Sequence, residues 1–187
     1  MMKHDFSHQT DAALYAMFSG TADEARSALE EAYNRYSQRI YAYCRRILGD
    51  DHAAADMLQE TFVRYYDQGR NGKVLLNHAS YLFKIARNLC YTHRDKASRI
   101  GGEVEDYHVP VSDVPYEHRE LIGLIKNALE EVPHDLREAF VLREYNGLSY
   151  QEISEIIGES MDVVKVRIFR AKKKLREILK PYVSEFE

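Results

Sequence analysis

Cysteine is scarce in this chain of 187 residues, and long apolar runs are absent from it. The two cysteines, Cys44 and Cys90, lie in apolar-periodic stretches, and they do not show a metal-ligand spacing. Two thiols do not make a disulfide framework, so we expect both to be reduced core residues. No stretch of about 18 apolar residues occurs, which argues against a membrane-spanning helix. We therefore expect the protein to stay in the cytoplasm.

Motifs that carry catalysis are also missing. The eight histidines are scattered, and none stands with a second ligand in a recognisable metal motif such as H-E-x-x-H. The sequence has neither a glycine-rich phosphate loop nor a nucleophile elbow. We therefore expect no catalytic residues, no bound metal and no cofactor.

The charge balance limits how the chain can bind nucleic acid. Hydrophobic residues make up 45% and charged residues 30%, which is typical of a folded globular protein. The formal net charge is −4, so the chain as a whole is not a polycation. A nucleic-acid site would have to come from cations gathered on one element.

Hydrophobic periodicity predicts an all-α fold. A first apolar stripe, with spacings of three and four, consists of Leu29, Tyr33, Tyr36, Ile40, Tyr43 and Ile47. The inner face expected for a second helix consists of Met57, Leu58, Phe62, Val63 and Tyr66. A third helix, which we expect Ser80 to cap, carries Leu82, Phe83, Ile85, Ala86, Leu89 and Cys90.

The composition changes over residues 100–117. This segment holds paired glycines, two prolines and five acids but no lysine or arginine, which is typical of a linker. We therefore predict two small helical domains, residues 1–99 and 118–187, joined by a flexible acidic linker at 100–117.

The C-terminal part has the pattern of a homeodomain-like helix-turn-helix without a wing. Ser149 and Glu152 form a capping box at the start of one helix. Gly158 can end that helix in the left-handed conformation, and Ser160 can cap the next one. A short helix, a tight turn and a second helix are the elements that DNA-binding proteins place in the major groove.

The last long helix separates an apolar face from a basic one. Its predicted buried residues are Val164, Ile168, Ala171, Leu175 and Ile178. Its cations are Lys165, Arg167, Arg170, Lys172, Lys173, Lys174 and Arg176. Such a helix fits a major groove, with base edges near its first turns and phosphates near its cations. The alternative is an ordinary amphipathic helix with a solvated basic face.

Three motifs resemble the extracytoplasmic-function (ECF) sigma factors of bacterial RNA polymerase, over about residues 11–179. The helix-turn-helix motif reads LSYQEISEIIG followed by VVKVRIFRAKKKLR. The segment that resembles the family's polymerase-binding helix reads DHAAADMLQETFVRYY. The segment that resembles its minus-ten helix reads SYLFKIARNLCYTHRDKASR. The resemblance implies a sigma factor that directs core polymerase to promoters, aids melting, and is restrained by an anti-sigma factor.

The resemblance also implies which residues bind. Contacts to the clamp helices of the largest polymerase subunit are expected from Asp56, Gln59, Glu60, Phe62 and Val63, with a further polymerase contact at the flap. The alternative is that the acids are a solvated helix face and that Phe62 belongs to the core. Minus-ten recognition and a flipped-base pocket are expected at the loop of residues 69–79 and at Asn77, Tyr81, Lys84, Arg87, Asn88 and Tyr91.

The helix-turn-helix is expected to read the minus-thirty-five element. Its predicted contacts are Ser149, Tyr150, Lys165, Val166, Arg167, Phe169, Arg170 and Lys172. The acidic linker is expected either to occupy the path of nascent RNA or to act as a solvated tether. An alternative function is a stand-alone helix-turn-helix regulator that acts without polymerase.

Overall fold

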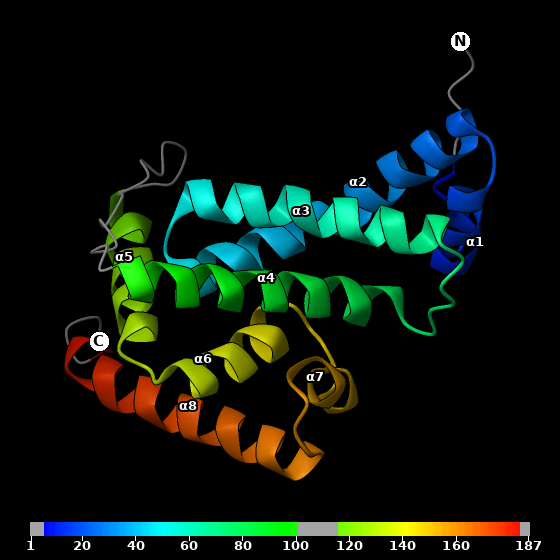
Figure 1. Cartoon of the computed structure of the whole chain (residues 1–187). Coiled ribbons are helices and arrows are strands. Elements are labelled where there is room, and N and C mark those ends of the chain that lie inside the picture. Colours follow the sequence, from blue (N-terminus) through cyan, green and yellow to red (C-terminus); the bar gives the residue numbers. More distant parts are fainter. Residues whose placement is uncertain (1–5, 101–115, 184–187) are drawn as a thin grey trace. The chain divides into compact units, whose positions relative to one another are not determined.

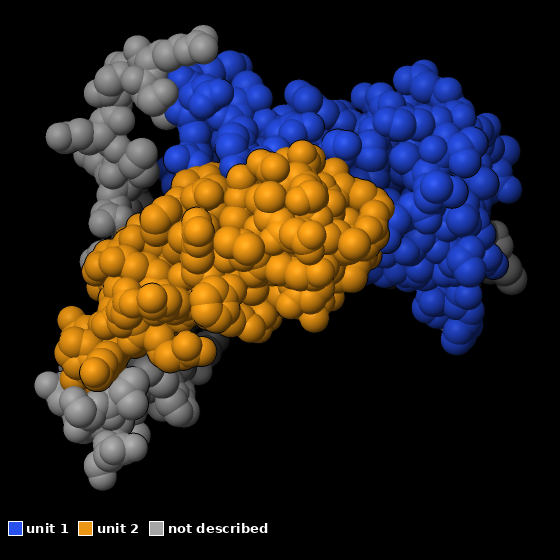
Figure 2. Space-filling model, turned by 90° about the horizontal axis from the view of Figure 1, so that it is seen from below, with its two compact units in different colours: residues 1–106 blue, residues 107–187 orange. Residues whose placement is uncertain are grey.

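The structure is a computed structural model that describes residues 6–100 and 116–183 (Figure 1). Within these two ranges the regular elements are all helical and no strand occurs, which confirms the all-α prediction. Two compact units comprise residues 1–106 and 107–187 (Figure 2). The predicted linker lies outside the described residues except at its ends, which belong to helices α4 and α5. The predicted domain limits therefore stay predictions.

The first unit is built on three long helices. They are α2 (Ala22–Leu48), α3 (Asp51–Arg70) and α4 (His78–Ile100), and each packs on the other two (Figure 1). Two short elements precede them, α1 (Asp11–Ala16) and the 3-10 turn η1 (Met17–Ser19), and both contact α2 and α3. Cys44 and Cys90 are buried in this core and do not form a disulfide, as predicted.

Local capping sets the boundaries of these helices. Thr21 and Glu24 form a capping box at the start of α2, and Gly49 ends that helix with φ 75°. The start of α4 differs from the prediction that Ser80 is its cap. Asn77 is the cap instead, because its side-chain oxygen accepts the Ser80 N–H at 2.9 Å.

The buried face of α2 begins on small residues. Ala25, Ala28 and Ala32 are buried, whereas Leu29 is half-buried and Tyr33 is exposed, although its ring packs on that of Phe62. The first two positions of the predicted stripe are therefore only partly buried. The predicted stripe is correct from Tyr36 to Ile47. The short element η1 packs against α2.

On α3 the predicted inner face is partly right. Leu58 and Phe62 are buried, but Met57 and Tyr66 are half-buried and Val63 is 53% exposed. The buried face is completed by Ala53, Ala54, Thr61, Tyr65 and Gly69. On α4 every residue of the predicted apolar face is buried.

The second unit packs shorter helices onto α8 (Met161–Val183). The other elements are α5 (Tyr116–Glu130), α6 (His134–Phe140), the π-helical turn η2 (Val141–Tyr145) and α7 (Tyr150–Ile157). Contacts join α8 to α5, α6 and α7. One core cluster consists of Ala128, Leu129, Val132, Ala171 and Leu175. Across the described helices of both units, none has the length and apolar character needed to cross a membrane.

Candidate nucleic-acid interface

The helix-turn-helix forms through the local signals that the sequence predicts. The Ser149 hydroxyl accepts the Glu152 N–H at 3.2 Å, and a Glu152 carboxylate oxygen accepts the Ser149 N–H at 2.7 Å. Gly158 ends α7 with φ 74°, and its N–H donates to the Ser154 carbonyl at 2.9 Å. Ser160 caps α8 by accepting the Val163 N–H at 3.4 Å. These bonds fix the turn between α7 and α8.

One face of α8 is buried and the opposite face is exposed. Val164, Ile168, Ala171 and Leu175 are buried, while Ile178 is half-buried. On the other side Phe169 is 68% exposed and Val166 is 46% exposed. Exposed residues that surround them are Met161, Val163, Lys165, Arg170, Lys172, Lys173 and Lys174. Met161, Val163, Val166 and Phe169 are exposed along the same part of α8, and a group of exposed apolar side chains is suited to binding a partner.

Several of the cations on α8 already have acidic partners. Arg167 is only 20% exposed and contacts Glu159 at 2.9 Å and Asp135 at 3.5 Å. Lys165 pairs with Asp162 at 3.2 Å, and Lys172 pairs with Glu144 at 2.8 Å. Arg167 therefore holds the turn to α6, whereas Arg170 is exposed and no described acid pairs with it.

The first residues of α7 also have partners within the same unit. The guanidinium carbon of Arg143 lies 4.7 Å from the centre of the Tyr150 ring. Glu152 already accepts the Ser149 N–H, so an anion at this helix start would compete with that carboxylate.

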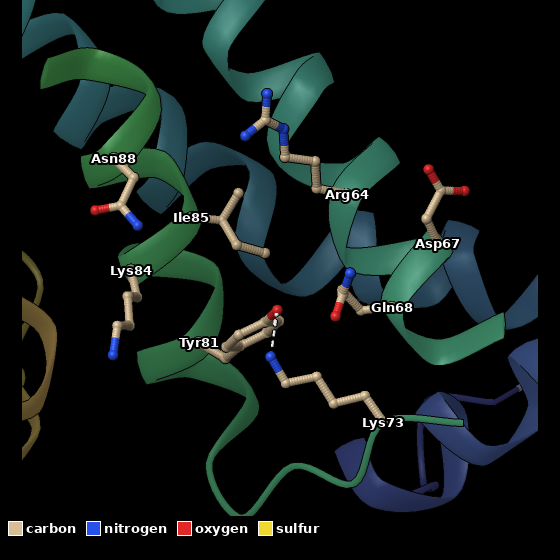
Figure 3. A pocket seen from close by; sticks show the side chains of 8 residues that line it. All are labelled: Arg64, Asp67, Gln68, Lys73, Tyr81, Lys84, Ile85 and Asn88. Atoms are coloured by element: carbon tan, nitrogen blue, oxygen red, sulfur yellow. Dashed lines mark hydrogen bonds between the residues drawn. The ribbon is translucent and has the colours of Figure 1, made fainter. Parts of the chain in front are cut away.

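A cavity of about 410 Å³ opens in the first unit between the end of α3, the following loop and the first turns of α4 (Figure 3). Its lining residues are Arg64, Asp67, Gln68, Lys73, Tyr81, Lys84, Ile85 and Asn88. Figure 3 shows Lys73 reaching from the loop to Tyr81. The Lys73 ammonium donates to the Tyr81 hydroxyl at 2.9 Å and lies 4.3 Å from the ring centre.

The loop from Asn71 to Asn77 presents apolar side chains to solvent. Val74 is 85% exposed and Leu76 is fully exposed. Gly72 has φ 73°, which favours glycine, and the Lys73 N–H donates back to the Gln68 carbonyl at 3.1 Å. The loop therefore returns beside the end of α3 and leaves its apolar tip unpacked.

A third surface lies on the outer side of α3. Asp56 and Gln59 are exposed, and Val63 follows Gln59 by four residues on the same face. Glu60 is half-exposed and pairs with Arg64 at 2.7 Å.

Comparison with known proteins identifies the family. The family model described as Sigma-70 region 2 matches residues 32–100, and that described as Sigma-70, region 4 matches residues 122–175. The ECF RNA polymerase sigma factor SigE of Mycolicibacterium smegmatis is 33% identical over 178 residues, which cover 91% of this chain and 69% of SigE. The chain belongs to the ECF sigma factors.

Other relatives and solved structures agree with this assignment. The ECF RNA polymerase sigma factor SigW of Bacillus subtilis is 28% identical over 83% of this chain and 90% of its own. The fold resembles the sigma factor RpoE in its complex with the anti-sigma factor NepR from Bartonella quintana, with TM-score 0.70, 24% identity and coverage of 81% and 96%. It also resembles CnrH in complex with the cytosolic domain of CnrY, with TM-score 0.68, 20% identity and coverage of 91% and 97%.

As an ECF sigma factor, the chain directs RNA polymerase to promoters. The alternative of a stand-alone helix-turn-helix regulator is not favoured, because the region 2 match accounts for the other half of the chain. The helix-turn-helix of the sigma factor lies within its region 4 match, and the cavity lies within its region 2 match.

The structure brings only part of the predicted minus-ten set of this sigma factor together. Tyr81, Lys84 and Asn88 line the cavity. Asn77 instead caps α4, and the guanidinium of Arg87 lies over the Tyr91 ring at 4.4 Å. The wall from α3 was not predicted, and it consists of Arg64, Asp67 and Gln68. Their spacing of three and four on one polar helix face was the available signal.

The predicted polymerase contact at Phe62 requires correction. Phe62 is 4% exposed and packs against the rings of Tyr33 and Tyr65, with centroids 4.9 and 6.5 Å away. The sigma factor therefore uses this residue in its core, which was the alternative interpretation. Val63, the next residue, is the exposed apolar side chain on this part of α3.

Proposed function

We propose that the cavity in the first unit binds a base extruded from the minus-ten promoter element. Extrusion costs a few kcal/mol of stacking, and an aromatic platform can offset that cost. Tyr81 supplies the ring, while Lys84 and Asn88 supply a cation and an amide at the cavity wall. The observation that carries this proposal is that these three side chains share one cavity.

The loop of residues 71–77 extends this site. Val74 and Leu76 are exposed beside a cavity lined by several cations. Apolar side chains with such neighbours can insert at a base step and unstack it. We propose that they contact the DNA where the strands separate.

We propose that α8 reads the minus-thirty-five element in the major groove. Lys165, Val166, Phe169 and Arg170 project from its exposed face. Valine and phenylalanine can pack on thymine methyl groups, and arginine can bond guanine in two places. Lys172 is more exposed and would exchange Glu144 for a phosphate, whereas Arg167 is only 20% exposed and pairs with two acids, so it supports the helix.

We propose that α3 docks on the clamp helices of the largest polymerase subunit. Asp56 and Gln59 offer polar contacts, and Val63 offers an apolar contact. Glu60 would leave its ion pair with Arg64 and pair with a cation of the polymerase. A second polymerase contact at the flap follows from the family. The solved complexes of RpoE with NepR and of CnrH with CnrY support a protein inhibitor for this chain as well.

We propose that the chain acts by binding alone and catalyses no reaction.

The acids of residues 100–117 are proposed to enter the path of nascent RNA. Replacing them with serine should then change the yield of abortive transcripts. An unchanged yield would leave the segment as a tether.

The experiment that tests the function is transcription in vitro with purified core polymerase on a library of promoter sequences. We expect the chain to select two elements, one near minus ten and one near minus thirty-five, only when core polymerase is present. Selection of DNA by the chain alone, with no transcript from the holoenzyme, would contradict the proposal.

A further inference from the structure

A short segment at the N-terminus contacts both ends of the loop beside the cavity. It consists of α1 and η1, residues 11–19, and is called the brace below. The region 2 match begins only at residue 32, after the brace. The brace is therefore outside the part of the chain that the family match describes.

The brace holds the end of α3, just before the loop. The Ser19 hydroxyl donates to the Gly69 carbonyl at 3.1 Å, and Arg70 donates to the Phe18 carbonyl at 3.4 Å. The Phe18 ring lies so close to Gly69 that a Cβ there would be 2.5 Å from Cδ2 of the ring. Only glycine leaves room for this contact without a shift of the chain.

The brace also holds the start of α4, just after the loop. The ring of Tyr15 meets the buried His78 ring edge-on, with centroids 4.9 Å apart. Nδ1 of His78 lies 2.9 Å from the Tyr65 hydroxyl, and the Tyr65 ring lies 5.0 Å from that of Tyr15. Burial lowers the pKa of His78, and the nearby Asp11 opposes this to a smaller extent. Burial of the Tyr15 hydroxyl raises its pKa to about 12.

One set of rings joins the two contacts. Phe18 is fully buried and packs edge-on against Tyr65 at 5.5 Å, and it also contacts Tyr66 at 5.2 Å. Tyr65 in turn bonds His78. A displacement of Phe18 would therefore disturb the packing at both ends of the loop.

We propose that the brace positions the loop of residues 71–77 for promoter melting, with Tyr15 and Phe18 as positioning residues. This inference rests on the function proposed for the cavity. The cavity residues Gln68 and Tyr81 lie one and three residues from the held positions Gly69 and His78. The Lys73 N–H bonds the Gln68 carbonyl, so the loop itself follows the end of α3. Loosening the brace would separate the walls of the cavity.

The test compares Phe18→Leu with Phe83→Leu in the full chain bound to core polymerase. Both phenylalanines are fully buried in the same unit, but Phe83 packs against Tyr43 and does not line the cavity. Transcription is measured on a duplex promoter and on the same promoter with its minus-ten region already unpaired. Ser19→Ala serves as a milder variant that removes the bond to Gly69 and keeps the aromatic core.

We expect Phe18→Leu to slow open-complex formation on the duplex promoter by about tenfold, which is less than the roughly 100-fold that a 1 Å misplacement of positioned groups can cost, because leucine keeps part of the apolar contact. The unpaired template should restore its activity, and Phe83→Leu should be active on both templates. Ser19→Ala should show the same pattern more weakly. Equal losses on both templates, or equal behaviour of the two phenylalanine variants, would overturn the inference. Unchanged open-complex formation by Tyr81→Ala on the duplex promoter would instead refute the function proposed for the cavity.

Discussion

The ammonium of Lys73 lies 2.9 Å from the hydroxyl of Tyr81 and 4.3 Å from the centre of its ring. The cation is therefore at the hydroxyl end of the ring, next to the face on which we propose that a base stacks. Lys73 belongs to the loop and Tyr81 to α4, so the contact joins two walls of the cavity. Under the proposed function, a base that stacks on Tyr81 competes with Lys73 for this side chain, and the ammonium can then pair with a nearby phosphate.

The first prediction concerns Tyr81. Tyr81→Ala should weaken binding of the holoenzyme to forked promoter DNA by about 1–3 kcal/mol, because a stacking surface is lost. Tyr81→Phe should retain most of this affinity, since it keeps the ring and loses only the hydroxyl bond to Lys73. Competition binding with an intact or an abasic nucleotide at the extruded position measures the effect. Equal binding of the intact DNA by wild type and Tyr81→Ala would exclude stacking on this ring.

The second prediction concerns base recognition by α8. Arg170→Ala should cost about 1–3 kcal/mol and relax the preference at one base pair, if Arg170 bonds a guanine in two places. Arg176→Ala is the matched control, because Arg176 is another exposed arginine of the same helix. Selection from a promoter library randomised around minus thirty-five measures the base preference of both variants. Uniform weakening on all sequences would make Arg170 a phosphate contact, and an unchanged profile would remove it from the interface.

The third prediction is a pH dependence of stability from His78. Because burial lowers its pKa below the usual 6.5, the unfolded chain binds the proton more readily than the folded one. Stability should be constant above about pH 6.5 and should fall as the pH decreases below it, by at most about 1.4 kcal/mol per pH unit for one proton.

Urea unfolding of the full chain, followed by tyrosine circular dichroism, measures this dependence on both sides of pH 6.5. His78→Gln removes the titrating ring and should flatten the curve in this range. A curve as steep as that of the wild type would assign the dependence to another group.

The fourth prediction concerns two glycines. Gly69→Ala should destabilise the chain by about 1–3 kcal/mol, because its Cβ would overlap the buried Phe18 ring. Gly123→Ala in α5 should instead be neutral or stabilise by up to about 1 kcal/mol, because no atom lies within 4 Å of its Cβ position. Urea unfolding compares the two. Equal effects of both changes would show that helix propensity, rather than the contact with Phe18, decides the result.

Local signals were the part of the fold that the sequence could predict. The capping box at Ser149 and the left-handed Gly158 involve residues a few positions apart, so their roles are visible in the chain itself. The apolar face of α4 was predicted correctly for the same reason. Periodicity could not decide whether Phe62 faces the core or a partner, because that depends on the rings of Tyr33 and Tyr65.

Long-range contacts were the part that it could not predict. The brace joins residues about fifty positions apart, as in the bond from Ser19 to Gly69, and no short-range pattern marks such a pair. The α3 wall of the cavity, with Asp67 and Gln68, becomes apparent only when α4 is placed beside it. Ser80 was misassigned as a cap because Asn77 competes for the same role three residues earlier.

The two carboxylates that hold Arg167 bear on any attempt to exchange promoter preference between relatives. Arg167 lies within α8, yet Asp135 belongs to α6 and Glu159 to the preceding turn. A graft of α8 alone would leave Arg167 without these partners wherever the recipient has other residues at positions 135 and 159. Chimaeras designed to redirect this protein should therefore transplant positions 135 and 159 together with α8.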